Sequence, residues 1–291
     1  MNITLWQTLF LAILQGVTEL FPISSLGHTV ILPSLLGWGD LVRDQHFLPL
    51  IVSLHLGTSI ALIIYFWRDW VKILRTLGDS IKKGEIQMGT DSWVSWLILI
   101  GCIPAGLIGV FLETPLKDLF ASPLIAASFL IVNGFILFFG ERLRKRRETR
   151  NADSGQPLAE TRRALSSLTW KEALLIGLAQ SLALLPGISR SGVTMVAGLG
   201  VRLDHEDAAR YSFLLGTPLI GAAAFLEIPQ LIGQSAYVLM IIIIGVVVSG
   251  IAAFLSTKFL LRYFETGRLH PFAYYCWGAG LLSLALLLIF R

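Results

Sequence analysis

Charged residues are scarce in this chain: Asp, Glu, Lys and Arg make up 14% of its 291 residues, against about 25% in ordinary soluble domains. Apolar residues make up 55%, and the mean hydropathy is +0.73. A chain of this composition cannot hide its apolar surface inside one soluble core, which excludes a soluble globular protein. The composition therefore predicts an integral membrane protein whose solvent is lipid.

Cysteine is almost absent too. Cys102 and Cys276 both lie in apolar stretches, which excludes a disulfide framework and is typical of small packing residues.

The apolar stretch Met1–Leu20 has no Lys or Arg before it, so it lacks the basic start of a secretory signal peptide and is expected to belong to the mature fold. The net charge is only +4, and the basic residues lie between apolar stretches. We therefore expect no nucleic-acid partner.

Six apolar stretches have close to the ~20 residues that a bilayer core requires. They are residues 48–67, 93–112, 123–140, 208–227, 236–260 and 271–290. Two further apolar stretches, 4–37 and 168–200, are interrupted near their middle by Pro, Gly and Ser. Irregular backbone at membrane depth is tolerated only where protein or a wet cavity surrounds it. We therefore predict that both interrupted stretches are re-entrant helical hairpins.

The two interrupted stretches resemble each other. Residues 15–27 (QGVTELFPISSLG) align without gaps on residues 180–192 (QSLALLPGISRSG), and Leu56-Gly57-Thr58 later matches Leu215-Gly216-Thr217. Chance similarity between apolar helices is the alternative, but the matches recur in the same order. The series predicts an internal duplication, with repeat 1 at about 1–145, repeat 2 at about 165–291, and a basic linker at about 141–169.

The duplication predicts an all-α, polytopic membrane helix bundle. Each half holds one hairpin and three spans, and because three is odd, the halves have inverted topology with the site where the hairpins meet. With this topology, 19 of the 23 Lys and Arg residues fall on one side. By the positive-inside rule that side is cytoplasmic and both termini are outside. Tryptophans near the predicted span ends are typical of interfacial anchors: Trp67, Trp70, Trp93 and Trp96.

The hairpins carry ionisable groups, which cost roughly 2.5–3.5 kcal/mol each in a membrane segment and so demand a reason. The first hairpin contains Glu19, Ser25 and His28, and the second contains Arg190 in the place equivalent to Ser25. We expect the symmetry to bring all four together. A structural ion pair between Glu19 and Arg190 is the alternative, as are packing roles for His28 and for His55, which lies in a predicted span.

These residue types suit phosphoryl transfer. Arg190 can bind phosphate bidentately, Glu19 can hold Mg²⁺ or Ca²⁺, and Ser25 can attack phosphorus while His28 takes its proton. Gly-containing turns that start a helix offer N–H groups to an anion, although the serines there can also act as helix caps. The residues expected to bind substrate are Gln15, Ser24, Gly27, Ser189, Ser191, Gly192 and Thr194.

Residues 15–28 (QGVTELFPISSLGH) and 186–192 (PGISRSG) resemble the two motifs of the undecaprenyl-diphosphatase family, the bacitracin-resistance type of membrane phosphatase. The resemblance implies hydrolysis of undecaprenyl diphosphate to undecaprenyl phosphate in the bacterial inner membrane, with the site toward its outer face. It implies recycling of the lipid carrier for the cell wall, and bacitracin resistance. It also implies that Glu19 assists metal or water, Ser25 attacks, His28 carries the proton and Arg190 clamps the phosphate.

Two positions depart from the family pattern. Gln15 stands where many relatives have Glu, and Leu26 where Thr is often found, so a metal site with two carboxylates is in doubt. The nucleophile stays open between Ser25 and a water activated at Glu19 or His28. The rival function is a secondary transporter or flippase, since inverted repeats with broken helices are common in transporters. A homodimer is also left open.

Overall fold

The computed structural model describes residues 3–112, 119, 122–153 and 163–290, and the regular structure of this part of the chain is helical. Six helices in it are long and apolar enough to cross a membrane, as predicted from the apolar stretches. They are α4 (Phe47–Tyr65), α6 (Asp91–Phe111), α8 (Pro123–Asp153), α12 (His205–Glu227), α13 (Ala236–Phe264) and α14 (His270–Ile289). The prediction of an all-α, multi-pass membrane bundle is confirmed.

The two interrupted stretches form two pairs of short helices. The first hairpin consists of α1 (Leu5–Thr18) and α2 (Ser25–Leu35), and the second of α10 (Trp170–Ser181) and α11 (Arg190–Gly200). A short 3₁₀ turn, η2 (Leu182–Leu184), follows α10. The longest of the four helices has 14 residues, or about 21 Å, which is less than the ~30 Å of a hydrocarbon core.

The two hairpins are built in the same way. Thr4 and Thr169 each start their hairpin with a capping box, closed by Gln7 in the first and Glu172 in the second. Such boxes satisfy orphan N–H groups at the helix start. The returning helices α2 and α11 both have 11 residues and both begin directly after a serine cap.

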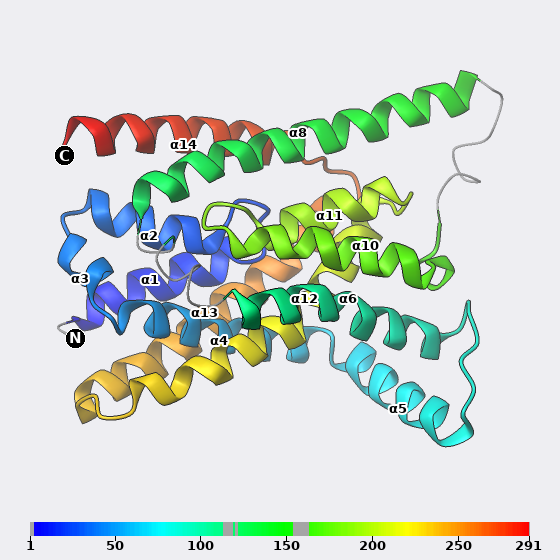
Figure 1. The fold of residues 1–291 in the computed structure, drawn as a ribbon, viewed down its shortest axis with the longest axis horizontal. Helices are drawn as coiled ribbons and strands as arrows, with labels where there is room; N and C mark the ends of the chain where they lie inside the picture. The colour runs from blue at the N-terminus through cyan, green and yellow to red at the C-terminus, as the bar shows by residue number, and fades with distance from the viewer. Residues whose placement is uncertain (1–2, 113–118, 120–121, 154–162, 291) are drawn as a thin grey trace.

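The spans pack around the hairpins (Figure 1). Helix α13 packs against α4 and α1, α14 against α8, and α10 against α6. Gly57 of α4 faces the backbone of Val246 and Gly250 in α13 so closely that a Cβ would overlap it. Close backbone approach at small residues is typical of helix packing in membranes. The solvent there is lipid, so burying apolar side chains between helices contributes little free energy, and van der Waals packing matters more.

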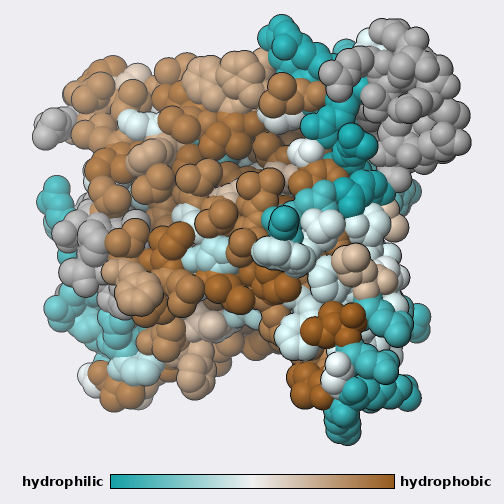
Figure 2. Space-filling model, turned by 45° about the vertical axis from the view of Figure 1, so that its right-hand side comes forward, coloured by the Kyte–Doolittle hydropathy of each residue, from teal (hydrophilic) through white to brown (hydrophobic). Residues whose placement is uncertain are grey.

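The outer surface is largely apolar, and Figure 2 shows a broad hydrophobic face with hydrophilic side chains at both of its ends. On α13, for example, Ile243, Val247, Ile251 and Leu255 are all exposed. The start of α1 and the end of α14 lie at the same end of the bundle, while α5 and the polar part of α8 extend at the other end (Figure 1).

Three helical segments lie where the sequence predicts only polar connections. Helix α5 (Trp67–Lys83) follows α4 almost directly, and α3 (Gly39–Arg43) joins the first hairpin to α4. Helix α8 continues to Asp153, so the first part of the predicted linker at 141–169 is helical. Another part of that linker, residues 154–162, lies outside the described residues. The 3₁₀ turns η1 (Leu165–Ser167) and η3 (Ile228–Leu231) complete the structure.

Candidate active site

The tip of the first hairpin brings Glu19 and Ser25 together. Glu19 is the last residue of the α1 turn, and Ser25 is the first residue of α2. Between them the chain reverses at Pro22 and at Ser24, whose φ of 69° is in the left-handed region that non-glycine residues rarely adopt. The Ser25 Oγ donates to Glu19 Oε2 over 2.5 Å, so the reversed backbone holds a hydroxyl against a carboxylate.

The tip of the second hairpin is in contact with the first. Phe21 O accepts from both Ser189 Oγ at 3.4 Å and Ser191 Oγ at 3.2 Å. A Cβ at Gly27 would lie 3.1 Å from the Cα of Gly187, so the two turns pack backbone against backbone. The two tips, far apart in sequence, therefore form one continuous unit.

Asn133 of α8 joins the two tips from the side. Its Nδ2 donates to Pro22 O at 2.9 Å, and its Oδ1 accepts from Ser189 N at 3.0 Å. Asn133 is fully buried, so one amide satisfies a donor of one hairpin and an acceptor of the other where water has no access.

Glu19 lies at the centre of the polar cluster. Its Oε1 accepts from Arg190 Nε at 3.3 Å and Nη2 at 3.2 Å. Its Oε2 accepts from Ser25 and lies 3.1 Å from His55 Nε2. The Nδ1 of His55 is hydrogen-bonded to Ile51 O at 3.0 Å. Both carboxylate oxygens are therefore engaged, by groups from both hairpins and from α4.

Arg190 is held by a third element as well. Its Nη1 donates to Ser212 O of α12 at 3.0 Å, and the guanidinium lies directly over Gly216, where a Cβ would overlap its Nη1 and Cζ atoms. The guanidinium has five N–H donors, and these contacts use three of them. The other two have no hydrogen-bond partner among the described residues and are available to an anion.

Two predicted residues contact groups outside the Glu19 cluster. His28 Nδ1 is hydrogen-bonded to Ser24 O at 2.7 Å, and His28 Nε2 to Tyr275 OH at 2.8 Å, so the hydroxyl of Ser25 contacts Glu19 and not His28. Thr194 donates to the α11 backbone and pairs with Ser212 Oγ at 2.6 Å. Both contacts secure the hairpins to neighbouring helices.

Gln15 has other partners than Glu19, Ser25 and Arg190. Its Oε1 accepts from Thr58 Oγ1 at 3.1 Å and from Ser249 Oγ, while its buried Nε2 has no hydrogen-bond partner among the described residues. The other predicted supporting residues lie at the tips: Ser24 caps α2 by accepting from Gly27 N, and Ser189 caps α11 by accepting from Gly192 N.

The described residues do not supply a protein-built metal site. No group of three or more His, Cys, Asp and Glu side chains in this part of the chain could hold a metal ion. Glu19 is the one carboxylate of the cluster, and both of its oxygens already have partners. Mg²⁺ and Ca²⁺ require several oxygen ligands, so the donor set does not fit a resident ion.

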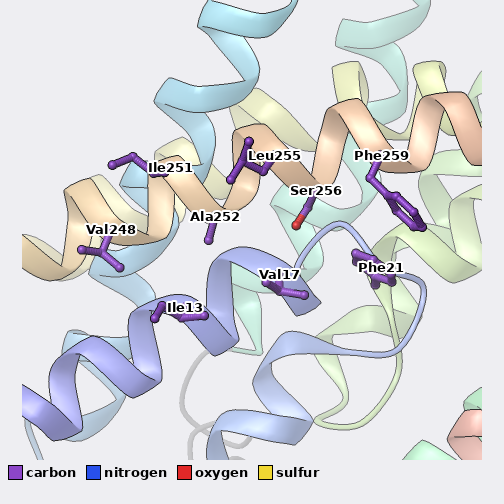
Figure 3. Close-up of a pocket in the computed structure, with 9 residues that line it drawn as sticks. All are labelled: Ile13, Val17, Phe21, Val248, Ile251, Ala252, Leu255, Ser256 and Phe259. Carbon is purple, nitrogen blue, oxygen red and sulfur yellow. The ribbon is translucent and has the colours of Figure 1, made fainter.

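An apolar groove of about 630 Å³ runs beside the first hairpin (Figure 3). One wall is formed by α1 and the hairpin tip, through Ile13, Val17 and Phe21. The other wall is α13, whose lining residues are Val248, Ile251, Ala252, Leu255, Ser256 and Phe259. Phe21 belongs to the tip of the first hairpin, so the groove reaches that tip.

Sequence reasoning missed Asn133 and Tyr275 and left His55 open. A single polar residue in an apolar span is a signal for Asn133, and a histidine in a span is one for His55. Neither signal says which way the side chain points, because that depends on the rotation of each helix about its axis.

The fold and the cluster define a class: a polytopic helical membrane protein with a buried carboxylate, hydroxyl, imidazole and guanidinium where two helical hairpins meet. The chain matches the family of the bacitracin resistance protein BacA over residues 8–282, and it belongs to that family. It is 46% identical to the undecaprenyl-diphosphatase of Acidiphilium cryptum, over 95% of both chains. It is 46% identical to that of Mycolicibacterium paratuberculosis over 93% of both, and 40% identical to undecaprenyl-diphosphatase 2 of Frankia alni over 97% of both.

Proposed function

We propose that this protein hydrolyses undecaprenyl diphosphate to undecaprenyl phosphate and inorganic phosphate, and so recycles the lipid carrier for cell-wall synthesis and confers bacitracin resistance. Relatives that cover nearly the whole chain bear the name of this activity. The observation that carries the proposal is the hydroxyl of Ser25 on the carboxylate of Glu19, with Arg190 on the other oxygen. A nucleophile, a base and an anion clamp thus share one buried site.

In the proposed reaction, the two free donors of Arg190 bind the terminal phosphate of the substrate. Glu19 takes the proton of Ser25 as Oγ bonds to the terminal phosphorus, and the bond from that phosphorus to the bridging oxygen breaks. Undecaprenyl phosphate leaves with the bridging oxygen, which takes the proton from Glu19, so the carboxylate is restored. Glu19 then deprotonates a water that attacks the phosphoserine, and the same proton passes to Ser25 Oγ as inorganic phosphate is released.

Two alternatives to this sequence stay within the proposal. A water deprotonated by Glu19 could attack directly, in which case Ser25 only orients it. His28 is the second proton carrier that the family resemblance implies. Its Nδ1 is hydrogen-bonded to a carbonyl, so Nδ1 carries a proton and Nε2 accepts from Tyr275. For Nε2 to take a proton directly from water or Ser25, that group must replace the Tyr275 hydroxyl as the hydrogen-bond partner of Nε2.

A divalent cation, Mg²⁺ or Ca²⁺, enters the proposal as a companion of the substrate. The diphosphate supplies oxygen ligands that the protein lacks, and such ions commonly bind through substrate phosphates together with one or two carboxylates. Glu19 could complete this ligand set only by exchanging one of its present partners, such as Ser25 or His55, for the ion. The ion would neutralise phosphate charge.

We further propose that the two hairpins are re-entrant, that they belong to inverted repeats, and that the site faces the outer side of the inner membrane with both termini outside. The matching caps and helix lengths of the two hairpins support the repeat. The clustering of Lys and Arg on one side supports the orientation. The apolar groove along α1 and α13 is the proposed place for the prenyl chain, since it reaches the tip of the hairpin that carries Glu19 and Ser25.

The rival function, transport of a phosphorylated lipid, is favoured by the paired broken helices. Phosphate release from undecaprenyl diphosphate by the purified protein separates the two. We expect release by the wild type and a loss of 10²- to 10⁴-fold in Glu19→Gln, since this is the usual contribution of a catalytic base. Ser34→Ala, on the same hairpin but away from the cluster, is the matched control. Transport into liposomes without phosphate release would overturn the proposal.

A further inference from the structure

Helix α5 is fixed in rotation about its axis. Ile73 and Ser80 are buried against α6, where Ser95 Oγ donates to Ile73 O at 3.2 Å and Trp96 Nε1 to Ser80 Oγ at 3.1 Å. Asp69 anchors the start of the helix by accepting from Arg210 of α12 at 2.5 Å. Because one face is committed to the bundle, the residues on the other faces are held outward.

One outward face of α5 is apolar. Trp67, Leu74 and Ile81 recur every seven residues, and Val71 lies between them on the same stripe. Their exposed fractions are 56%, 65%, 62% and 57%. We call these four residues the apolar stripe. A fixed, exposed stripe of this size needs an apolar environment.

The neighbouring outward face is cationic. Arg68, Arg75 and Lys82 also recur every seven residues, each directly after a member of the apolar stripe, and all three are exposed. The guanidinium of Arg68 lies 5.4 Å from the centre of the Trp67 ring. We call these three residues the cationic row. No ion pair to an acidic residue is found for them within the described part of the chain.

We propose that α5 is an interfacial helix that binds the anionic phospholipid headgroups of the leaflet at this end of the bundle. Helix α4 ends at Tyr65 and α5 begins at Trp67, so the stripe starts where a membrane span stops. Tryptophan at that level is typical of the membrane–water interface. The apolar stripe inserts among acyl chains, and the cationic row contacts lipid phosphates.

The shape of the molecule agrees with this occupant. Helix α5 diverges from the bundle at the end opposite the start of α1 (Figure 1). At that end, Figure 2 shows hydrophobic side chains bordered by hydrophilic ones. An apolar stripe flanked by basic residues is the pattern by which surface helices bind anionic membranes.

The first test measures the depth of each face. Nitroxide labels are placed in Leu74→Cys and in Asp79→Cys, which lies on the charged side of α5, in full-length protein with Cys102 and Cys276 replaced by Ala and reconstituted in phosphatidylglycerol–phosphatidylcholine vesicles. We expect the label at 74 to be accessible to oxygen in the lipid and the label at 79 to a water-soluble nickel complex. A label at 74 that is accessible only from water, or buried by a protein partner, overturns the proposal.

The second test measures headgroup preference. The ratio of association constants of spin-labelled phosphatidylglycerol and phosphatidylcholine is compared between wild type and the triple variant Arg68→Glu/Arg75→Glu/Lys82→Glu. Each basic residue near an anionic surface contributes about fivefold to binding, so we expect the ratio to fall at least fivefold, and to fall in the wild type at high salt.

The matched control is Arg142→Glu/Lys145→Glu/Arg146→Glu, three exposed cations on the protruding end of α8, which changes the net charge equally. We expect this control to keep most of the preference, and both triple variants to keep wild-type phosphate release in detergent. An equal loss of preference in both, or no loss in the α5 variant, contradicts the proposal.

Discussion

Gly216→Ala tests whether Arg190 must occupy its observed position. A Cβ at Gly216 would overlap Nη1 and Cζ of Arg190 and would lie 2.7 Å from Nη2. The guanidinium would have to move away, and with it the contacts to Glu19 Oε1 and to Ser212 O. The substitution adds one methyl group on α12 and changes no residue that contacts the substrate in the proposed reaction.

The magnitude follows from what is lost. Removing one preorganised donor from a site that stabilises developing negative charge costs about 10²- to 10³-fold in kcat. Breaking a buried ion pair costs roughly 3–5 kcal/mol of stability. In Gly216→Ala the loss of stability should be smaller than this, because His55 still contacts Glu19 and because alanine is favoured over glycine in a helix by about 1 kcal/mol. We expect a folded protein with about 10²-fold or greater loss of turnover.

The assay is phosphate release from undecaprenyl diphosphate in detergent, with thermal unfolding measured in parallel. Gly106→Ala is the control, because a Cβ there meets its nearest atom outside its own helix, Cδ1 of Leu219, at 3.9 Å. In the Gly216→Ala background, Arg190→Ala should add little further loss, since the two changes remove the same contact. Wild-type turnover in Gly216→Ala would refute the assigned position of Arg190.

Three further outcomes are expected. Asn133→Ala leaves Pro22 O and Ser189 N buried without a partner, at about 1–3 kcal/mol each, so its melting temperature should fall by several degrees while Ser128→Ala on the exposed side of α8 leaves it unchanged. His55→Ala removes a hydrogen bond to a charged group, worth about 1.5–3 kcal/mol, and should lower kcat roughly 10- to 150-fold, whereas His46→Ala should not. EDTA should abolish turnover, with recovery in Mg²⁺ or Ca²⁺, but should leave the melting temperature of substrate-free protein unchanged; a shift would reveal a resident ion.

The spanning helices could be predicted from the sequence because their signal is local. A run of about 20 apolar residues is sufficient to identify a span, and Pro and Ser at the two tips are sufficient to identify a break. The alignment of the two predicted repeats also pairs Ser25 with Arg190, and the structure places both of them on Glu19. A contact between residues far apart in sequence could therefore be predicted from the similarity of two stretches of the chain.

The directions of single side chains could not be predicted in the same way. Gln15 and Glu19 lie four residues apart and both contact α4, through Thr58 and His55 respectively. Their other partners differ, because Gln15 also contacts Ser249 of α13, while Glu19, just past the end of α1, contacts Arg190 of the opposite hairpin. His55 reaches Glu19 only because of how α4 is rotated, and no residue count reports that rotation.

Helix α5 shows a signal that was present and not used. The segment 67–83 repeats its apolar and basic residues every seven positions, which is a helical period. Because the segment carries many charges, it contains no long apolar run and was not predicted to be a helix. A search for apolar runs does not detect a helix that is apolar on only one side.

The central claim is that the tips of the two hairpins touch and pool their polar groups. A Cβ at Gly192 would lie 3.4 Å from the Cβ of Pro22, close to the range of 3.5–4.5 Å in disulfides. In a background with Cys102 and Cys276 replaced by alanine, Pro22→Cys/Gly192→Cys should form an intramolecular disulfide upon mild oxidation in membranes, detected by mass spectrometry. Two thiols that stay reduced in the folded protein would contradict the account.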